Sequence, residues 1–225
     1  MDSATPPRKS LLQRAFDDVT AVGGGVDVEE DPIRVRLLDA AYDQFRRMGI
    51  QRTSLEEVAR RAGTSRVTLY RKFTNKDILV EEVMLREFRR YLVQFLADVA
   101  PARTAADRLV AGFLSAYRAV TTNPLIIGLL EVEPSVLAGL IGGDDGRLLT
   151  AVRIFVAAQL REEQQAGNLR GDLDVDLTAE MLARISVSFV VIPSHIIDLS
   201  DDDQLVDVAR RYLVPMLDAP PPTTG

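Results

Sequence analysis

Cysteine and tryptophan are absent from the 225-residue sequence, histidine occurs once, and aromatic residues make up only 6% of the chain. Without cysteine, disulfides, thiolate metal sites and cysteine nucleophiles are excluded, and the composition is compatible with a reducing compartment. A zinc centre needs several ligands at defined spacing, which one histidine does not supply. We therefore expect no metal and no cofactor. An enzyme is the least favoured function class, because only carboxylates, serines and lysines remain for catalysis and no paired arrangement of them is visible.

Long apolar runs are missing as well. No segment approaches the roughly 18 apolar residues of a membrane-spanning helix, and the opening MDSATPPRKS lacks the apolar core of a secretory signal. The chain is 47% hydrophobic and 27% charged, an ordinary globular balance, so we expect a cytoplasmic protein. Alternating apolar and polar residues over a useful length are also lacking, which favours an all-α fold.

Positive charge is scarce overall but concentrated in one region. The chain carries a formal net charge of -6, yet residues 33–76 hold eleven Lys/Arg against four Asp/Glu, a local net charge of +7. Residues 77–225 hold thirteen against twenty-two. On charge alone, a solvated face and a surface that binds a polyanion are equally open interpretations.

Helix signals begin inside this basic region. Apolar residues recur at helical spacing over residues 33–48 and predict a first helix after a proline. A second helix begins at Ser54, which can form a capping box with Glu57 three residues later. Thr53 with Glu56 is the alternative register.

The next residues predict a turn and a third helix. Ala59 is small where two helices approach, and Gly63 permits the positive φ of a tight turn. Ser65 caps the third helix, whose residues Leu69 and Phe73 are four apart and face inward. Together these features predict a helix-turn-helix, whose second helix leaves one face free to enter a DNA major groove.

That free face carries side chains suited to DNA. Arg66 can donate to guanine edges or phosphate, Thr68 offers a hydroxyl and a methyl, and the phenol of Tyr70 can reach phosphate. Arg71 and Lys72 add positive charge.

The stretch TSLEEVARRAGTSRVTLYRKFTNKDIL, preceded by IRVRLLDAAYDQFRRMGIQRTS, resembles the DNA-binding domain of TetR-family (tetracycline repressor family) transcriptional regulators. TLYRKF followed by NKD is its most diagnostic part, and the resemblance covers about residues 33–80. Two positions depart from the family pattern: Thr64 stands where an apolar residue is usual, and Val67 where Gly, Ala or Pro is frequent. The DNA contacts that the resemblance implies are Ser54, Ser65, Arg66, Val67, Thr68, Tyr70, Arg71, Lys72 and Lys76.

The resemblance also implies an architecture and partners. Members are all-α homodimers with an N-terminal three-helix DNA-binding domain and a C-terminal helical domain that binds a small molecule and dimerises. Accordingly we expect a disordered arm (1–31), a helix-turn-helix domain (32–76), a ligand-binding and dimerisation domain (77–219) and a disordered tail (220–225). Within the arm a short helix over 10–19 is possible, and Arg8 and Lys9 either contact a DNA backbone or are idle.

Helical segments are expected throughout the C-terminal part, at 76–99, 103–122, 124–131, 134–141, 145–166, 176–198 and 203–217. The run ISVSFVVIPSHII could form a strand, but its length favours a buried helix that Pro193 kinks or shortens. Asp176 is expected to cap that helix. The lone histidine, His195, fits a structural role better than ligand sensing.

Two further sets of residues are candidates for function, and for each the alternative is simple core packing. An apolar or amphipathic effector would be lined by Phe88, Tyr91, Phe95, Phe113, Tyr117, Ile126 and Leu130, with Arg118 or Glu131 at a polar end. A dimer interface would include Leu149, Val152, Phe155, Val156, Gln159, Met181, Ile185, Ser188, Phe189 and Ile192.

The leading hypothesis is thus a ligand-responsive DNA-binding regulator, most simply a repressor, that binds palindromic double-stranded DNA as a homodimer and is released by a small molecule. The alternative is a helical ligand-binding or scaffolding dimer whose basic segment binds no DNA. Retention on DNA at low salt separates the two.

Overall fold

A computed structural model describes residues 14–15, 17–19, 31–133, 147–192 and 194–218. All regular elements in these ranges are helical, which confirms the all-α fold. No helix in the described ranges is long and apolar enough to cross a membrane. The helices are α2 (Pro32–Met48), α3 (Leu55–Arg61), α4 (Arg66–Lys72), α5 (Lys76–Val99), α6 (Ala105–Thr122), α7 (Pro124–Val132), α9 (Arg147–Gln165), α10 (Val175–Val191) and α11 (Asp202–Val208), which continues as a π-helical turn (Ala209–Leu213) and a 3₁₀ turn (Val214–Asp218).

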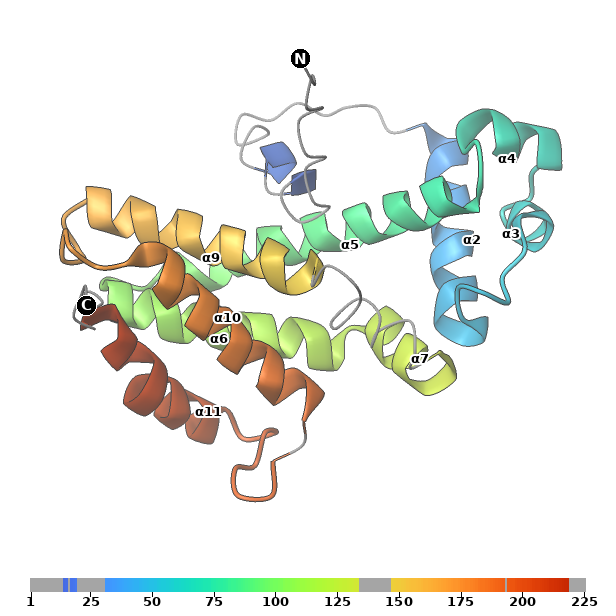
Figure 1. The fold of residues 1–225 in the computed structure, drawn as a ribbon. Coiled ribbons are helices and arrows are strands. Elements are labelled where there is room, and N and C mark those ends of the chain that lie inside the picture. Colours follow the sequence, from blue (N-terminus) through green and yellow to red (C-terminus); the bar gives the residue numbers. More distant parts are fainter. Residues whose placement is uncertain (1–13, 16, 20–30, 134–146, 193, 219–225) are drawn as a thin grey trace, which may run out of the picture.

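The helices divide into a small head and a larger body (Figure 1). Helices α2, α3 and α4 form the head at one end, and α5 runs from the head into the body, where α6, α9, α10 and α11 pack together. The head core is not closed by its own helices alone. Leu125 and Leu129 of α7 are 1% exposed and belong to the same apolar cluster as Phe45, Leu69 and Phe73. Helix α7 therefore joins the body to the head.

The body has its own core, built from α6, α9, α10 and α11. Phe113 of α6 meets Phe189 of α10 edge-on, with ring centroids 5.8 Å apart. Leu182, Leu205 and Leu213 are almost completely buried in the same cluster. The first part of the apolar run ISVSFVVIPSHII, residues 185–191, is thus the end of a helix that faces this core.

Part of the segment expected to be a disordered arm is helical. Residues 14–15 and 17–19 have helical geometry, and Ala15 is fully buried against α5 and α9 in a cluster with Leu85, Leu92 and Ala151. Arg14 pairs with Glu81, and Asp18 pairs with Arg89 of α5 at 2.5 Å. The predictions for Arg8 and Lys9, the helix over 134–141, Pro193 and the tail 220–225 concern residues outside the described ranges.

Helix α10 departs from the sequence-based expectation at both ends. It begins at Val175 because Asp174 is the cap, its side chain accepting from the Leu177 N–H at 3.0 Å. Asp176, expected as the cap, lies in the first turn instead and pairs with Arg153 and Arg161 of α9. The helix ends at Val191 rather than near residue 198. His195 is consequently exposed in a loop and is not a buried structural histidine.

Candidate nucleic-acid interface

Two serine caps define the helix-turn-helix. Ser54 Oγ accepts from the Glu57 N–H at 3.2 Å, and Ser65 Oγ accepts from the Thr68 N–H at 3.1 Å. These bonds satisfy amides that have no partner within their own helices. The alternative register at Thr53 is wrong: its buried hydroxyl donates to the Gly49 carbonyl at 2.7 Å and closes the preceding turn.

The Glu57 side chain, the second member of the expected capping box, forms its contacts with two arginines of α3. Arg60 Nη2 contacts the Glu57 carboxylate at 2.6 Å and Arg61 Nε contacts it at 2.9 Å. Hydrogen bonds from Arg60 and then Arg61 lower the pKa of Glu57 from 4.5 to about 2. Glu57 therefore forms ion pairs with Arg60 and Arg61 on the exposed side of α3, and its backbone N–H is the donor to the Ser54 cap.

The turn between α3 and α4 has the predicted chemistry. Gly63 has a φ of 63°, a left-handed conformation that glycine adopts without steric cost. The Thr64 N–H donates to the Ala59 carbonyl at 3.0 Å and closes the turn. Leu69 and Phe73 are completely buried, so the predicted anchors of α4 are confirmed.

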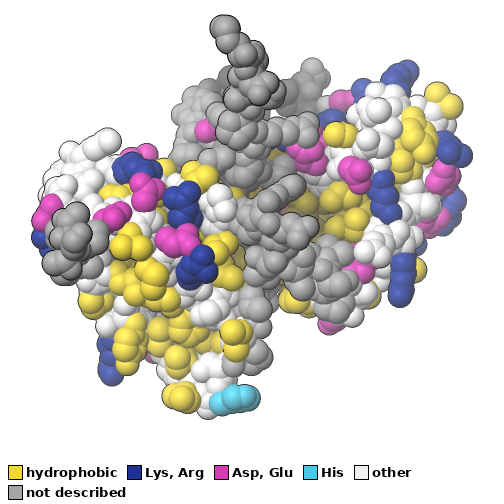
Figure 2. All heavy atoms as spheres, in the orientation of Figure 1, with side chains coloured by type: hydrophobic (Ala, Val, Ile, Leu, Met, Phe, Trp, Pro, Cys, Tyr) yellow, Lys and Arg dark blue, Asp and Glu magenta, His cyan; other side chains and the backbone are white. Residues whose placement is uncertain are grey.

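The opposite face of α4 is left open. At about 100° per residue, Val67 and Arg71 lie one turn apart on the side of the helix that points away from Leu69 and Phe73. Val67 is 79% exposed, and Tyr70 and Arg71 are exposed beside it. In Figure 2, Lys and Arg side chains surround the right-hand end of the molecule, which contains this head. The face presents positive charge, a phenol and one apolar side chain.

Arg66 is held by its neighbours. Its guanidinium lies over the Tyr70 ring, 5.3 Å from the ring centroid, and pairs with Glu56 of α3 at 3.0 Å. A hydrogen bond that Arg66 donates to the Tyr70 hydroxyl, and then the charge of Glu56, raise the pKa of Arg66. The side chain is thus directed along the outer edge of the helix-turn-helix before any DNA is present.

Two of the expected phosphate ligands have partners within the head. Lys72 forms an ion pair with Asp31, the cap of α2, and its hydrogen bond lowers the pKa of that carboxyl. Lys76, an expected DNA contact at the start of α5, donates from Nζ to the Gln51 carbonyl at 2.9 Å. A phosphate would have to take over these contacts.

The seven residues expected to line one effector pocket lie in three places. Phe88 and Tyr91 pack against the cluster around Ala15, and Phe95 meets Phe155 edge-on at 5.2 Å. Burial, and then the charge of Asp98, raise the pKa of Tyr91. Phe113 is core, Ile126 is half-buried and Leu130 is exposed. Helical spacing can indicate which face of a helix carries apolar residues. It does not indicate which other helix that face contacts, so the expected common pocket does not follow from it.

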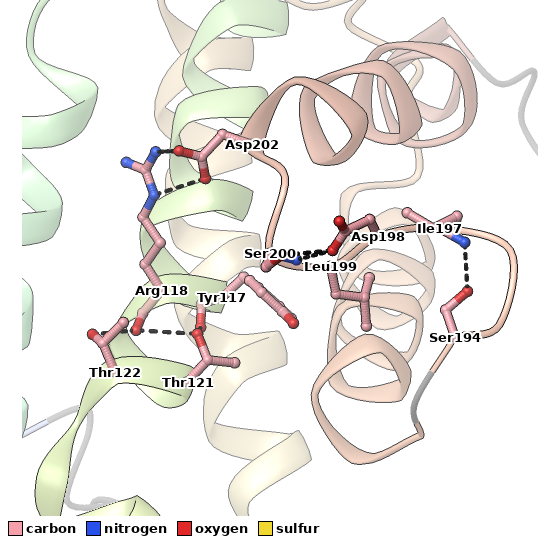
Figure 3. A pocket seen from close by; sticks show the side chains of 10 residues that line it. All are labelled: Tyr117, Arg118, Thr121, Thr122, Ser194, Ile197, Asp198, Leu199, Ser200 and Asp202. Atoms are coloured by element: carbon pink, nitrogen blue, oxygen red, sulfur yellow. Dashed lines mark hydrogen bonds and ion pairs between the residues drawn. The ribbon is translucent and has the colours of Figure 1, made fainter.

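Tyr117 does line a cavity, in a place that the sequence did not indicate. A groove of about 700 Å³ lies between the end of α6 and the loop after α10 (Figure 3). Arg118 contributes to its wall and is paired with Asp202, while Ser194 turns the loop by accepting from the Ile197 N–H at 3.0 Å. The groove combines a phenol, an ion pair and hydroxyls with the apolar edges of Ile197 and Leu199.

The residues expected at a dimer interface fall into a buried group and an exposed group. Val152, Phe155, Val156, Ile185 and Phe189 pack against the protein's own clusters, which agrees with the alternative of core packing. Met181 and Ser188 are exposed on α10, as are Leu177 and Arg184 at the same helical spacing, and Ile192 is exposed directly after the helix. In Figure 2, hydrophobic side chains gather at the lower left, where α10 and its neighbours lie in Figure 1.

Comparison with known proteins bears on the head first. The family of bacterial regulatory proteins called the tetR family matches residues 37–83, which run from α2 through α4 into α5. The uncharacterized HTH-type transcriptional regulator Rv1255c of Mycobacterium tuberculosis is 30% identical over 182 residues, which cover 81% of this chain and 84% of that relative. The chain belongs to the TetR family.

Other likenesses cover more of the chain than the head. The HTH-type transcriptional repressor KstR2 of Mycolicibacterium smegmatis is 29% identical over 147 residues, covering 64% of this chain and 71% of the relative. The solved structure of Salmonella enterica GusR has a TM-score of 0.58 at 21% identity, covers 86% of this chain and 99% of that one, and shows the shared fold. This TetR-family chain is a DNA-binding transcriptional regulator, and these relatives are regulators rather than enzymes.

One contact that ties α7 to the head of this TetR-family regulator has no signal in the local sequence. Glu133, at the end of α7, accepts from the Ile50 N–H at 2.7 Å and from the Gln51 N–H at 2.8 Å. Its carboxylate also lies over Gly49, where an added Cβ would come within 2.5 Å of the Glu133 side chain. Glu133 is thereby joined to residues 83 and 82 positions earlier in the chain, which the sequence around it does not indicate.

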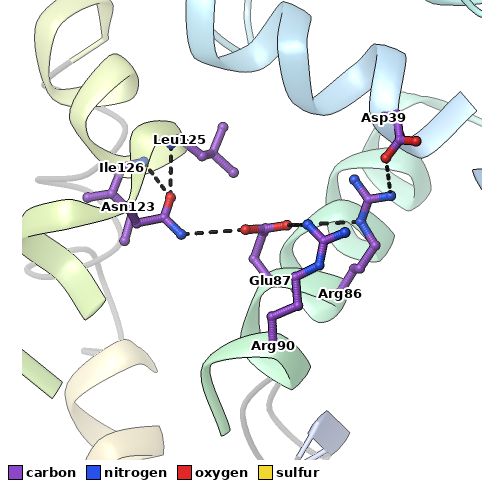
Figure 4. A network of polar contacts seen from close by, with 7 residues as sticks. All are labelled: Asp39, Arg86, Glu87, Arg90, Asn123, Leu125 and Ile126. Carbon is purple, nitrogen blue, oxygen red and sulfur yellow. Dashed lines mark hydrogen bonds and ion pairs between the residues drawn. The ribbon is translucent and has the colours of Figure 1, made fainter. Parts of the chain in front are cut away.

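A second polar network connects α2, α5 and α7 (Figure 4). Arg86 of α5 pairs with Asp39 of α2 at 2.7 Å, and neighbouring Glu87 pairs with Arg90 at 2.8 Å. Asn123, the cap of α7, donates to Glu87 at 3.4 Å while its carbonyl accepts from the Leu125 N–H. The head is thus tied through α5 and α7 to the body at several points.

Proposed function

We propose that this TetR-family regulator is a repressor that binds a palindromic operator as a homodimer and leaves it when a small molecule binds. The observation that carries the proposal is the outer face of α4, where Val67, Tyr70 and Arg71 stand opposite the buried Leu69 and Phe73. A major groove admits one such helix, and a two-fold dimer doubles its few contacts. The name of KstR2 as a repressor agrees with the proposed direction of regulation.

The proposed DNA contacts fall into two groups. Val67, Thr68, Tyr70 and Arg71 project from the middle of α4 and would meet base edges. The others would hold phosphates, and Arg66 and Lys72 would exchange their present carboxylate partners, Glu56 and Asp31, for phosphate oxygens. The phosphate-holding residues are Ser54, Ser65, Arg66, Lys72 and Lys76.

We further propose that residues 32–76 are the DNA-binding domain and residues 77–219 the ligand-binding and dimerisation domain. The exposed stripe of α10 supports a subunit interface there, since exposed apolar side chains gathered on one face often mark an interaction site. Leu177 and Met181, and Ile192 directly after the helix, supply its apolar part, and Arg184 and Ser188 share the stripe. An isologous contact of α10 with its own copy would bury the stripe from both sides.

The groove beside Tyr117 is the proposed effector site. Tyr117 and Leu199 would contact an apolar part of the molecule. Arg118 would hold a polar end once its contact with Asp202 is exchanged. An amphipathic small molecule fits this combination. Mass spectrometry of the protein as purified, or a crystal structure of it, would identify a bound molecule, and Arg118→Gln should weaken its binding while operator binding persists.

Operator binding tests the main proposal. Fluorescence anisotropy with the DNA upstream of the protein's own gene should show binding that weakens steeply with salt. Arg71→Ala should weaken it about tenfold or more, because a side chain at a base edge is lost. Arg211→Ala is the matched control, since Arg211 is exposed on the π-helical turn at the far end of the body.

Two results would contradict the proposal. Equal affinities for both variants would show that α4 is not the reading element. Absence of DNA binding even at low salt would favour the helical ligand-binding or scaffolding dimer.

A further inference from the structure

Val67 occupies the middle of the reading face. Leu69 and Phe73, both completely buried, fix the orientation of α4, and Val67 projects on the opposite side with 79% of its surface exposed. It is the most exposed large apolar side chain of the head, and Arg71 stands one helical turn beyond it. If α4 enters a groove, this side chain approaches the base edges at the centre of the contact.

The neighbours of Val67 leave it a purely apolar role. Arg66 is directed to Glu56 and Tyr70, and the hydroxyl of Thr68 lies 2.9 Å from that of Ser65. Val67 has no polar atom in its side chain and cannot contact phosphate. Its isopropyl group lies between Arg66 and Arg71 on the helix. Removing this group from water is favourable only when it packs against another apolar group.

The major groove offers one such group. Among the groups that the base pairs present there, the C5-methyl of thymine is the only methyl; the others are hydrogen-bond donors, acceptors or flat ring C–H groups such as the C5–H of cytosine. We propose that Val67 reads the C5-methyl of one thymine in each operator half-site. This inference rests on the proposed function, since it assigns a base to the face already proposed to bind DNA.

Replacing thymine by deoxyuridine removes that methyl and leaves every hydrogen bond of the base pair in place. The expected loss of affinity is about fourfold per half-site, because the contact of one methyl-sized apolar group is lost to water. Binding sites are first selected from a random duplex library with the full-length protein. Affinities are then measured for one selected site and for the same site with single thymines replaced by deoxyuridine in both half-sites.

Three variants assign the methyl contact. The wild-type protein and Val93→Ala should show the uridine penalty at one thymine per half-site; Val93 is a 60% exposed valine on α5 and controls for the loss of two methyls from the surface. Val67→Ala should bind the thymine and uridine sites within about twofold of each other. Thr68→Ser removes the other methyl on this face, keeps the hydroxyl, and should retain the full penalty.

Each outcome is decisive. Binding to a selected site with no uridine penalty overturns the assignment while the proposed function stands. A penalty that disappears in Thr68→Ser but persists in Val67→Ala assigns the contact to Thr68 and also overturns it. Failure to select any site refutes operator binding, and the assignment falls with it. Circular dichroism of the variants checks that α4 remains folded, which is expected because alanine favours a helix over valine.

Discussion

Glu133 Oε2 accepts a hydrogen bond from the backbone N–H of Ile50 at 2.7 Å, and its other oxygen serves Gln51 at 2.8 Å. The carboxylate is 7% exposed and lies at the end of α7, while both amides belong to the turn between α2 and α3. One side chain of the body thus satisfies two backbone donors of the head. Movement of α7 cannot leave the helix-turn-helix unaffected unless both bonds break.

Glu133→Gln should destabilise the protein by about 1–3 kcal/mol, because the amide retains one acceptor and turns an N–H₂ group towards a buried backbone donor. Urea denaturation followed by circular dichroism measures the change. Glu131→Gln is the matched control: Glu131 is exposed two residues earlier on α7 and should change stability by less than about 0.5 kcal/mol. Equal midpoints for the two variants would show that the contact adds nothing to stability.

Gly128→Ala tests the close approach of α7 to α2. An added Cβ would come within 2.2 Å of the Arg46 carbonyl oxygen, which is backbone and cannot yield without separating the helices. We expect a loss of at least about 2 kcal/mol. Gly171→Ala is the control, because nothing lies within 4 Å of its added Cβ and it should be neutral or slightly stabilising. A Gly128→Ala variant as stable as Gly171→Ala would mean that the two helices can move apart freely.

The sequence predicted the head well because its determinants are local. Ser54, Gly63 and Ser65 act within four residues, and the Leu69/Phe73 pair follows from helical periodicity. Contacts between residues far apart in the sequence cannot be predicted from such local patterns. Nothing near Glu133 indicates amides more than 80 residues earlier.

The body shows the same limit. Periodicity placed Phe155 and Phe189 on apolar faces, but a face that meets a partner subunit has the same pattern as one that meets Phe95 or Phe113. The end of α10 was missed because its apolar run continues past the last helical turn, to Ile192 and Ile196. The proposed dimer face could be narrowed to α10 only once internal packing had accounted for the other candidate residues.

Glu56→Gln should strengthen DNA binding a few-fold at low salt. The substitution removes a carboxylate that pairs with Arg66 at 3.0 Å and that would repel nearby phosphates. The gain should shrink as salt rises, because both groups are exposed and screened. Anisotropy titrations at two salt concentrations measure it, with Glu131→Gln as a control for charge alone. Weaker binding by Glu56→Gln would show instead that the carboxylate is needed to orient Arg66.

Met181→Glu should convert a dimer into monomers. Met181 is exposed at the centre of the α10 stripe, and two copies of a new carboxylate would face each other across a two-fold interface. Sedimentation velocity measures the change. Val93→Glu introduces the same charge at an exposed position on α5 and should leave the dimer intact. A protein that sediments as a dimer in both variants would place the interface elsewhere.

Glu57 should remain ionised well below the pH at which an ordinary glutamate protonates, because Arg60 and Arg61 lower its pKa from 4.5 to about 2. A lowered folded-state pKa gives stabilisation that is complete above pH 4.5 and is lost as the pH falls towards 2. In a ¹³C NMR titration from pH 7 to pH 3.5, the side-chain carboxyl carbon of Glu57 should therefore shift little. Arg60→Gln removes the larger of the two causes, so protonation should begin at higher pH; identical titration curves would show that solvent screens the pair.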